Sequence, residues 1–327
     1  MCTSISFKNG NSHYFGRNLD LQTDYPVATV ITPRNHEFKF RHIPHLNKHY
    51  AIIGTAIVAD ETPLYFEGMN EKGLGMAGLA FFGLGYYPPV EEGKTNVASF
   101  EFLPYILGQA ATVEEAKKLL ENINIDNEGF SEALPPEALH WIISDENSSI
   151  VVETTKFYGL KVYDNVWNCL TNTPTFDYME WNMNYYVNLT GKMVPIRFAD
   201  NKDGLYEYSR GMGSIGLPGG VDSISRFVRE AFTLRNSICP DEEMKNVAEF
   251  FHILGNVQQV SGEDEVSENV YEITQYTAGG NTKTGVWYHT TYYNPNIYAV
   301  DMNKENLDGT DVIVYPFKRD LLVNFDN

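Results

Sequence analysis

Short stretches of apolar and β-branched residues, some of them alternating with polar ones, occupy both ends of the chain. Gly, Pro or Asn bounds many of these stretches, which is typical of β-strands. In the first third they predict strands at 2–8, 12–19, 27–32, 50–58 and 74–82. Further strands are expected at 139–144, 149–155, 159–163, 270–277, 284–292, 296–301 and 311–315.

The pattern between these strands favours helices. Residues Ser99–Gln109 predict a buried apolar helix, and the capping box at Thr112–Glu115 opens an amphipathic helix that ends near Asn122. The remaining expected elements are helices at 178–189, 222–236 and 243–257, and loops at 83–98, 123–138 and 200–220.

The order of these elements limits the fold. Strands, then helices, then strands follow one another without regular β-α-β alternation, which argues against a doubly wound parallel sheet. Two mainly antiparallel sheets stacked between helix layers fit the order better. No repeat, low-complexity segment or long linker divides the chain, so we expect one domain covering 1–327.

Composition and charge narrow the class of partner. A net charge of −19 argues against nucleic acid or an anionic membrane. Three cysteines give no disulfide framework and suit a reducing compartment. No apolar segment follows Met1 and no run of 18 apolar residues occurs, so neither a secretion signal nor a membrane span is predicted. We therefore expect a cytoplasmic protein.

The first candidate for chemistry is Cys2, which directly follows Met1. Removal of Met1 before this small residue would leave Cys2 with both a thiol and a free α-amino group. An α-amine titrates near neutral pH, so it can take the proton of the thiol and later return it. Cys2 is thus a candidate nucleophile, the alternative being an inert buried cysteine.

A hairpin signal places other residues near Cys2. With Asn9-Gly10 as a two-residue turn, Cys2 pairs with Arg17, whose guanidinium would favour the thiolate. With Gly10-Asn11 as the turn, Cys2 faces Leu19 instead. The sequence alone leaves both registers open.

Two further patterns carry less weight. Residues Gly211–Gly216 match GxGxxG, but no clear strand precedes them, and we interpret the segment as a loop. His42, His45 and His49 are spaced by three and four residues, but Pro44 lies among them and no carboxylate pattern accompanies them. We therefore expect surface histidines, with no metal site.

Several blocks, in order along nearly the whole chain, resemble the choloylglycine hydrolase family. These N-terminal-nucleophile hydrolases include bile salt hydrolases and penicillin V acylases. The blocks are MCTSISF and YFGRNLDL within 1–21, ITPRN at 31–35, NEKGLGMAGL at 70–79, LTNTPTF at 170–176, YSRGMGSIGLPGG at 208–220, SRFVREAF at 225–232, FFHIL at 250–254 and VDMNKENLDG at 300–309. The resemblance implies an α+β fold, a four-layer αββα sandwich, in a bacterial, cytoplasmic homotetramer that needs no metal or cofactor.

The resemblance also implies roles for individual residues. Arg17 and Asp20 match the arginine and aspartate of the family's GRN-x-D segment, and the aspartate would accept from the α-amino group of Cys2. The Asn172 side chain and the backbone N–H of Ala80 would form the oxyanion hole. The implied catalytic set is Cys2, Arg17, Asp20, Ala80, Asn172 and Arg226.

Asn172 and Arg226 can also be interpreted without a catalytic role. Asn172 precedes a Thr-Pro pair and would serve as a turn residue that bonds to its own backbone. Arg226 lies four residues before Glu230 on an expected helix, which predicts a surface ion pair. The match to the family's SRF segment makes Arg226 an active-site arginine instead.

The substrate class is less well marked. Bile salt hydrolases usually carry Asn, and penicillin V acylases Tyr, where this chain has Ala80. The other blocks favour a bile salt hydrolase that releases glycine or taurine; the alternatives are a penicillin V acylase or other N-acyl amide hydrolase of the family, and a non-catalytic binding protein on the same fold. Four residues, each equally plausible as core, lie where the family lines its pocket: Leu19, Tyr25, Phe66 and Leu134.

Overall fold

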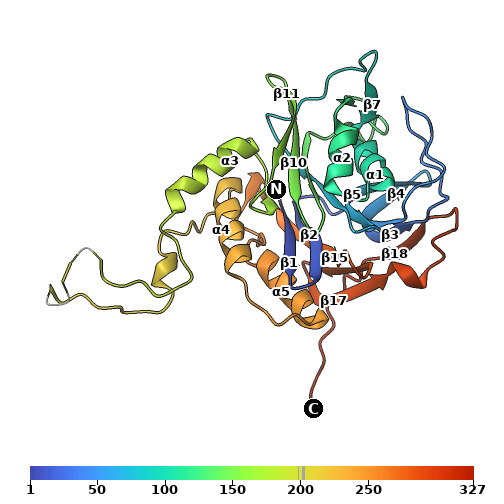
Figure 1. Cartoon of the computed structure of the whole chain (residues 1–327). Coiled ribbons are helices and arrows are strands. Elements are labelled where there is room, and N and C mark those ends of the chain that lie inside the picture. Colours follow the sequence, from blue (N-terminus) through green and yellow to red (C-terminus); the bar gives the residue numbers. More distant parts are fainter. Residues whose placement is uncertain (198, 201–202) are drawn as a thin grey trace.

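Two large antiparallel sheets lie face to face in the computed structural model, which describes residues 1–197, 199–200 and 203–327 (Figure 1). One sheet has six strands in the described residues, in the spatial order β12 (Cys169–Leu170), β1 (Cys2–Asn9), β2 (Ser12–Leu21), β15 (Ile273–Asn281), β16 (Val286–Thr291) and β17 (Asn294–Asp301). The other has eight, in the order β11 (Gly159–Asp164), β10 (Ser149–Thr155), β9 (Leu139–Ser144), β6 (Gly75–Ala80), β5 (Thr62–Asn70), β4 (Ile52–Ala59), β3 (Ala28–Thr32) and β18 (Ile313–Pro316).

Helices cover the outer face of each sheet. On the six-stranded sheet, α4 (Ser223–Asn236) and α5 (Glu243–Gly255) pack against β1. On the eight-stranded sheet, α1 (Ser99–Gln109) packs against β4, β5 and β6, and is followed by α2 (Val113–Leu120). The result is the expected four-layer αββα sandwich, so the α+β fold class is confirmed.

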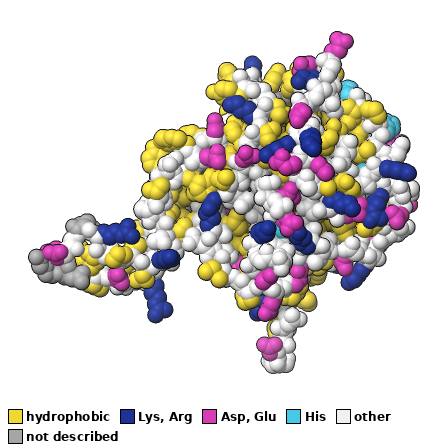
Figure 2. All heavy atoms as spheres, viewed as in Figure 1, with side chains coloured by type: hydrophobic (Ala, Val, Ile, Leu, Met, Phe, Trp, Pro, Cys, Tyr) yellow, Lys and Arg dark blue, Asp and Glu magenta, His cyan; other side chains and the backbone are white. Residues whose placement is uncertain are grey.

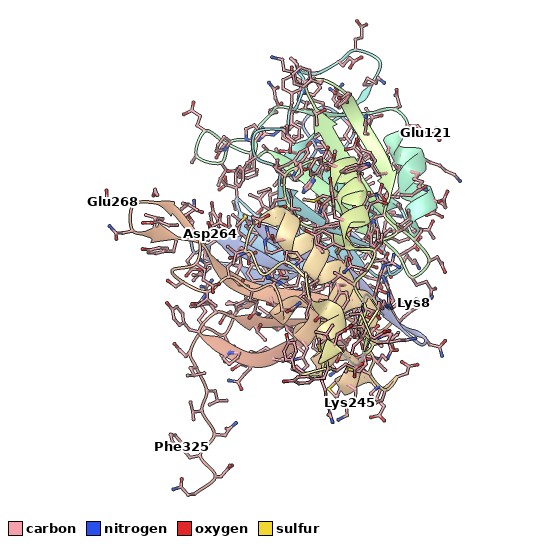
Figure 3. All side chains as sticks on the ribbon, turned by 90° about the vertical axis from the view of Figure 1, so that its left-hand side faces the viewer. Lys8, Glu121, Lys245, Asp264, Glu268 and Phe325 are labelled. Atoms are coloured by element: carbon pink, nitrogen blue, oxygen red, sulfur yellow. The ribbon has the colours of Figure 1, made fainter. Side chains whose placement is uncertain are left out.

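Smaller elements complete the fold. Helix α3 (Phe176–Asn182) continues into a 3₁₀ turn at Met183–Tyr186, shorter than the helix expected at 178–189. The chain then extends away from the body before it returns to α4 (Figure 1). Two short strand pairs, β7 (Thr95–Ala98) with β8 (Ile123–Asp126) and β13 (Glu265–Ser267) with β14 (Val270–Tyr271), lie outside the large sheets. In Figure 3, Asp264 and Glu268 mark the projecting β13–β14 hairpin and Phe325 marks the extended C-terminal tail.

The two sheets approach most closely where β2 and β6 cross. A Cβ atom on Gly75 would lie 2.4 Å from the ring of Phe15, so only glycine fits there. Strand β1 is buried over its first six residues because the second sheet covers one of its faces and the helices cover the other. Close packing therefore brings the end of β6 against the N-terminal end of β1.

Five strands of the described residues were not expected from the pattern: β5, β7, β8 and the very short β12 and β13. The sequence of β5 carries Pro63, Glu67 and Gly68, which hide a strand that is nevertheless central to its sheet. Strands β7 and β8 are four residues each and lie at the ends of segments expected to be loops. Strand β8 reads INID, an alternating pattern that the loop prediction overlooked, whereas β7 reads TNVA and does not alternate.

The register of the first hairpin is the second of the two that the sequence left open. Asn9 pairs with Ser12 and Cys2 pairs with Leu19, so the Cys2–Arg17 pairing is wrong. Gly10 takes a φ of +56° at the first central position of the turn, which is the place of glycine in a type II′ turn. Asn9 stays in the strand, where its side-chain amide donates to Asn246 Oδ1 at 2.7 Å.

Candidate active site

Cys2 and Arg17 remain neighbours despite the change of register. Because Cys2 lies opposite Leu19 and Ser4 lies opposite Arg17, the four side chains share one face of the hairpin. Cys2 and Arg17 are then diagonal neighbours, which long side chains can span. Both line the same cavity, so Arg17 still lies near the thiol, but as a diagonal neighbour and not directly opposite Cys2 as one of the two predicted registers had it.

Arg17 is a buried cation with buried partners. Its Nη1 donates to Gly78 O, and its Nε lies 3.7 Å from Glu67 Oε2. Burial lowers the pKa of Arg17, but the neighbouring Cys2 and Glu67 raise it further, so the net shift is upward and the guanidinium stays charged. Burial raises the pKa of Glu67 to about 7, although Arg17 opposes that shift. Tyr276 donates its hydroxyl to Glu67 at 2.9 Å.

The α-amino group of Met1 is partly buried and lies beside a carboxylate. It donates to the backbone oxygen of Asp20 at 2.7 Å and pairs with the carboxylate of Glu272. Burial raises the pKa of Glu272, while this amine opposes the shift. Nothing in the sequence around Glu272 indicated this contact, because the residue comes from the far end of the chain.

The nitrogen of Cys2 donates to Asn172 Oδ1 at 2.7 Å. With Met1 in place this nitrogen is an amide, so acceptance by Asp20 concerns the chain without Met1 and stays a prediction. The Asp20 side chain is buried; its Oδ1 accepts from Thr274 Oγ1 at 2.6 Å, and its Oδ2 has no partner among the described residues. Burial raises the pKa of Asp20, and Arg226 is the largest opposing influence.

Arg226 ties the nucleophile strand to the Asn172 loop. Its Nη1 donates to Cys2 O and to Thr3 Oγ1, each at 2.6 Å, and its Nη2 donates to Asn172 Oδ1 at 2.7 Å. The surface ion pair with Glu230 is wrong, because this face of α4 packs inward and both side chains are fully buried. The carboxylate oxygens of Glu230 have no hydrogen-bond partner in the part of the chain that is described.

Ala80 and Asn172 meet at the end of β6. Asn172 Nδ2 donates to Ala80 O at 2.8 Å, which uses one of the two N–H groups of the side-chain amide. Phe81 N donates to Ala138 O on the β9 side. Because alternate residues of a strand point their backbone groups to opposite sides, the N–H of Ala80 points away from β9, where pairing with β5 has already ended at Ala77. This N–H therefore faces the side on which Asn172 lies.

A cavity of about 360 Å³ opens beside these groups. Its walls are mainly apolar. They include the rings of Tyr25 and Phe66, whose centroids lie 5.9 Å apart. All four predicted pocket residues, Leu19, Tyr25, Phe66 and Leu134, line it together with Cys2, Arg17 and Ala80. Sequence reasoning missed Phe100 and Phe130, which line it from α1 and from a segment expected to be a loop.

A cysteine that directly follows Met1, beside a buried arginine in an αββα sandwich, is the arrangement expected of an N-terminal-nucleophile hydrolase. Residues 2–315 match the family of linear amide C–N hydrolases, choloylglycine hydrolase family. The chain belongs to this family of enzymes.

Individual relatives are similar over nearly their whole length. A bile salt hydrolase/transferase from Lactiplantibacillus plantarum is 45% identical, with 97% of each chain covered, and one from Clostridium perfringens is 40% identical, with 100% of each covered. A solved structure of a variant of the conjugated bile acid hydrolase from Clostridium perfringens superposes with a TM-score of 0.92 at 39% identity, over 100% of both chains. A penicillin V acylase from Agrobacterium tumefaciens shares the fold, with a TM-score of 0.76 at 20% identity over 99% of this chain and 100% of that one.

Proposed function

We propose that this protein is a bile salt hydrolase, which cleaves the amide bond of bile salts conjugated to glycine or taurine. The observation that carries the proposal is an apolar, aromatic-lined cavity with Cys2 in its wall. Apolar walls suit a steroid, and the thiol can reach an amide carbonyl that the steroid side chain presents. The similarity to relatives that are named bile salt hydrolases supports the same substrate class.

The chemistry is acyl transfer by the mature chain, one domain from which Met1 has been removed. The Cys2 thiolate, beside the Arg17 guanidinium, attacks the carbonyl carbon, and the oxyanion accepts from the Ala80 N–H and from the second N–H of Asn172. The α-amino group, which Asp20 orients, protonates the leaving amine. Water then hydrolyses the thioester with the same amine as base. Arg226 holds Cys2 and Asn172 in register through this sequence.

Two alternatives make different predictions for one experiment. A penicillin V acylase would share the fold and nucleophile, and a non-catalytic binding protein would bind without turnover. Purified protein, shown by mass spectrometry to begin at Cys2, is incubated in parallel with glycocholate, taurocholate and penicillin V, with Cys2→Ala as control. Release of glycine or taurine faster than the cleavage of penicillin V supports the proposal. The reverse order identifies an acylase. No turnover of any of the three substrates overturns the proposal in favour of a binding protein or another N-acyl amide hydrolase of the family.

We also propose that the enzyme assembles as a homotetramer in the bacterial cytoplasm. In the described residues between α3 and α4, large apolar side chains are exposed along a segment that leaves the body of the molecule (Figure 2). Examples are Tyr185, Val187, Tyr206 and Tyr208, each at least 67% exposed. No helix in the described part of the chain is long and apolar enough to cross a membrane. Light scattering on the eluting peak tests the assembly, since a mass of 37.1 kDa would identify a monomer.

A further inference from the structure

A buried histidine lies behind the two segments that carry the proposed oxyanion donors. His140 belongs to β9, and its side chain is fully buried. Its ring stacks on that of Phe81, with the centroids 4.4 Å apart and an angle of 8° between the planes. Phe81 directly follows Ala80, so one face of the imidazole supports the segment that carries the Ala80 N–H.

A ring nitrogen of the same histidine contacts the second segment, which carries Asn172. His140 Nε2 lies 2.9 Å from Thr171 O. A carbonyl oxygen only accepts, so Nε2 carries a proton and donates it. Thr171 directly precedes Asn172. One side chain thus contacts both segments, one residue away from each proposed donor.

Glu153, in β10, fixes the orientation of the histidine. Its Oε1 lies 3.1 Å from His140 Nδ1 and accepts from the backbone N–H of Phe176 at 3.0 Å. Since Nε2 donates to Thr171 O, Nδ1 is the ring nitrogen that faces the carboxyl group of Glu153. The pair therefore holds the Asn172 segment at two points, Thr171 O and the N–H of Phe176.

We propose that His140 is a positioning residue that sets the spacing between the Ala80 N–H and the Asn172 side chain. This inference rests on the proposed function, because the oxyanion hole belongs to it. The two segments are also joined directly, by Asn172 Nδ2 to Ala80 O and by Thr173 Oγ1 to Phe82 O, each at 2.8 Å. These bonds keep the segments together when the histidine is lost, so its removal changes alignment more than folding.

Two substitutions separate the roles of the ring and of the N–H. His140→Phe keeps a flat ring against Phe81 but cannot donate to Thr171 O. It is expected to lower kcat for glycocholate by about 10- to 50-fold with KM changed by less than about twofold, since misplaced groups slow the chemical step while the pocket walls still bind substrate. His140→Gln offers an amide N–H toward Thr171 O, and we expect it to recover most of the lost kcat.

A matched control comes from the other sheet. His289, in β16, is also buried, and its ring stacks on Phe317 with the centroids 3.8 Å apart. His289→Phe makes the same chemical change away from the oxyanion hole, and kcat should stay within about twofold of wild type. Alkylation of Cys2 by iodoacetamide needs the nucleophile but no oxyanion hole. Its rate in His140→Phe should therefore equal that of the wild-type enzyme.

The outcomes separate this inference from the proposed function. If the wild-type enzyme hydrolyses glycocholate but His140→Phe keeps its kcat, or if alkylation of Cys2 slows in parallel with turnover, His140 does not position the oxyanion hole and the function stands. If the wild-type enzyme, beginning at Cys2, hydrolyses no conjugate, the function itself fails. Should circular dichroism show His140→Phe unfolded, His140→Leu replaces it. Leucine also lacks a donor to Thr171 O and is closer to histidine in volume, and a kcat equal to that of the wild-type enzyme overturns the proposal.

Discussion

Replacing Ala80 by proline tests the oxyanion hole at its backbone donor. The N–H of Ala80 points away from β9 and lies beyond the last residue of β6 that pairs with β5. Proline at this position therefore removes a donor without removing a ladder hydrogen bond, the situation in which strands tolerate proline. The preceding residue, Leu79, lies in a strand, and a following proline favours that extended conformation. We expect Ala80→Pro to fold.

The expected loss follows from the number of donors. The proposed hole has two, the Ala80 N–H and one N–H of Asn172, and loss of one such donor costs about 2.7–4 kcal/mol, or about 10²–10³ in kcat. KM should change little, because Tyr25 and Phe66 still form the apolar wall. Ala80→Gly is the matched control, since it keeps the N–H and should lower kcat by no more than about threefold, with a stability loss of about 1 kcal/mol.

The assay is kcat and KM for glycocholate, with circular dichroism and thermal unfolding to show that each variant is folded. A folded proline variant with the kcat of Ala80→Gly would refute the assignment of this N–H. If the proline variant does not fold, incorporation of lactate at position 80 removes the same N–H by placing an ester oxygen there. A wild-type kcat in that protein refutes the assignment equally.

Four further predictions concern the removal of Met1, the nucleophile, the substrate and the pH dependence of stability. Activity should require removal of Met1, because an acylated Cys2 nitrogen cannot act as base; mass spectrometry of active protein should show Cys2 first, and full activity with Met1 retained would contradict the mechanism. Cys2→Ser should nearly abolish turnover. Cys169→Ser should keep it, because burial raises the pKa of the Cys169 thiol well above its usual range and leaves it unreactive. Inactivation by iodoacetamide through Cys169 would contradict the assignment of Cys2 as the nucleophile. Ala80→Asn should raise the ratio of glycocholate to penicillin V activity, and Ala80→Tyr should lower it. The expected change is about five- to tenfold, because one net hydrogen bond is worth about 1 kcal/mol. An unchanged ratio would mean that the side chain of residue 80 does not face the substrate. Burial lowers the pKa of His289 to about 4. The unfolded chain therefore binds a proton at this residue below about pH 6.5, while the folded protein does so only near pH 4, and the free energy of unfolding falls by about 2 kcal/mol at pH 5. Urea unfolding should show a smaller loss of stability between pH 8 and pH 5 in His289→Phe than in the wild-type protein.

The hydrophobic pattern predicts much of the fold because most strands alternate or run apolar between turn residues. It fails at β5, where Glu67 occupies an interior position of a central strand. A buried carboxylate normally argues against a core strand. Here Arg17 and Tyr276, from the facing sheet, supply the charge and the hydrogen bond that keep it there. A pattern that reads one segment at a time cannot detect such a partner.

The sequence also predicts only part of the candidate site, namely the residues that lie close together along the chain. Cys2, Arg17 and Asp20 lie within one hairpin, so their proximity follows from local pairing even after a slip of register. Glu272, between β14 and β15, and His140, in β9, are distant in sequence and reach the site through sheet order and sheet stacking. No short-range signal in the sequence could have indicated them.

The register explains why the slip did not remove Arg17 from the nucleophile. Turn residues shift by one between the two candidate hairpins, and the partner of each β1 residue shifts by two. Since side chains alternate with a period of two, a shift of two keeps every residue on its original face. Arg17 moves from directly opposite Cys2 to its diagonal neighbour, and the length of an arginine side chain covers the difference. Leu19 takes the place opposite the thiol and joins the cavity wall. One hairpin thereby supplies the nucleophile, its cationic neighbour and part of the apolar surface that receives the substrate.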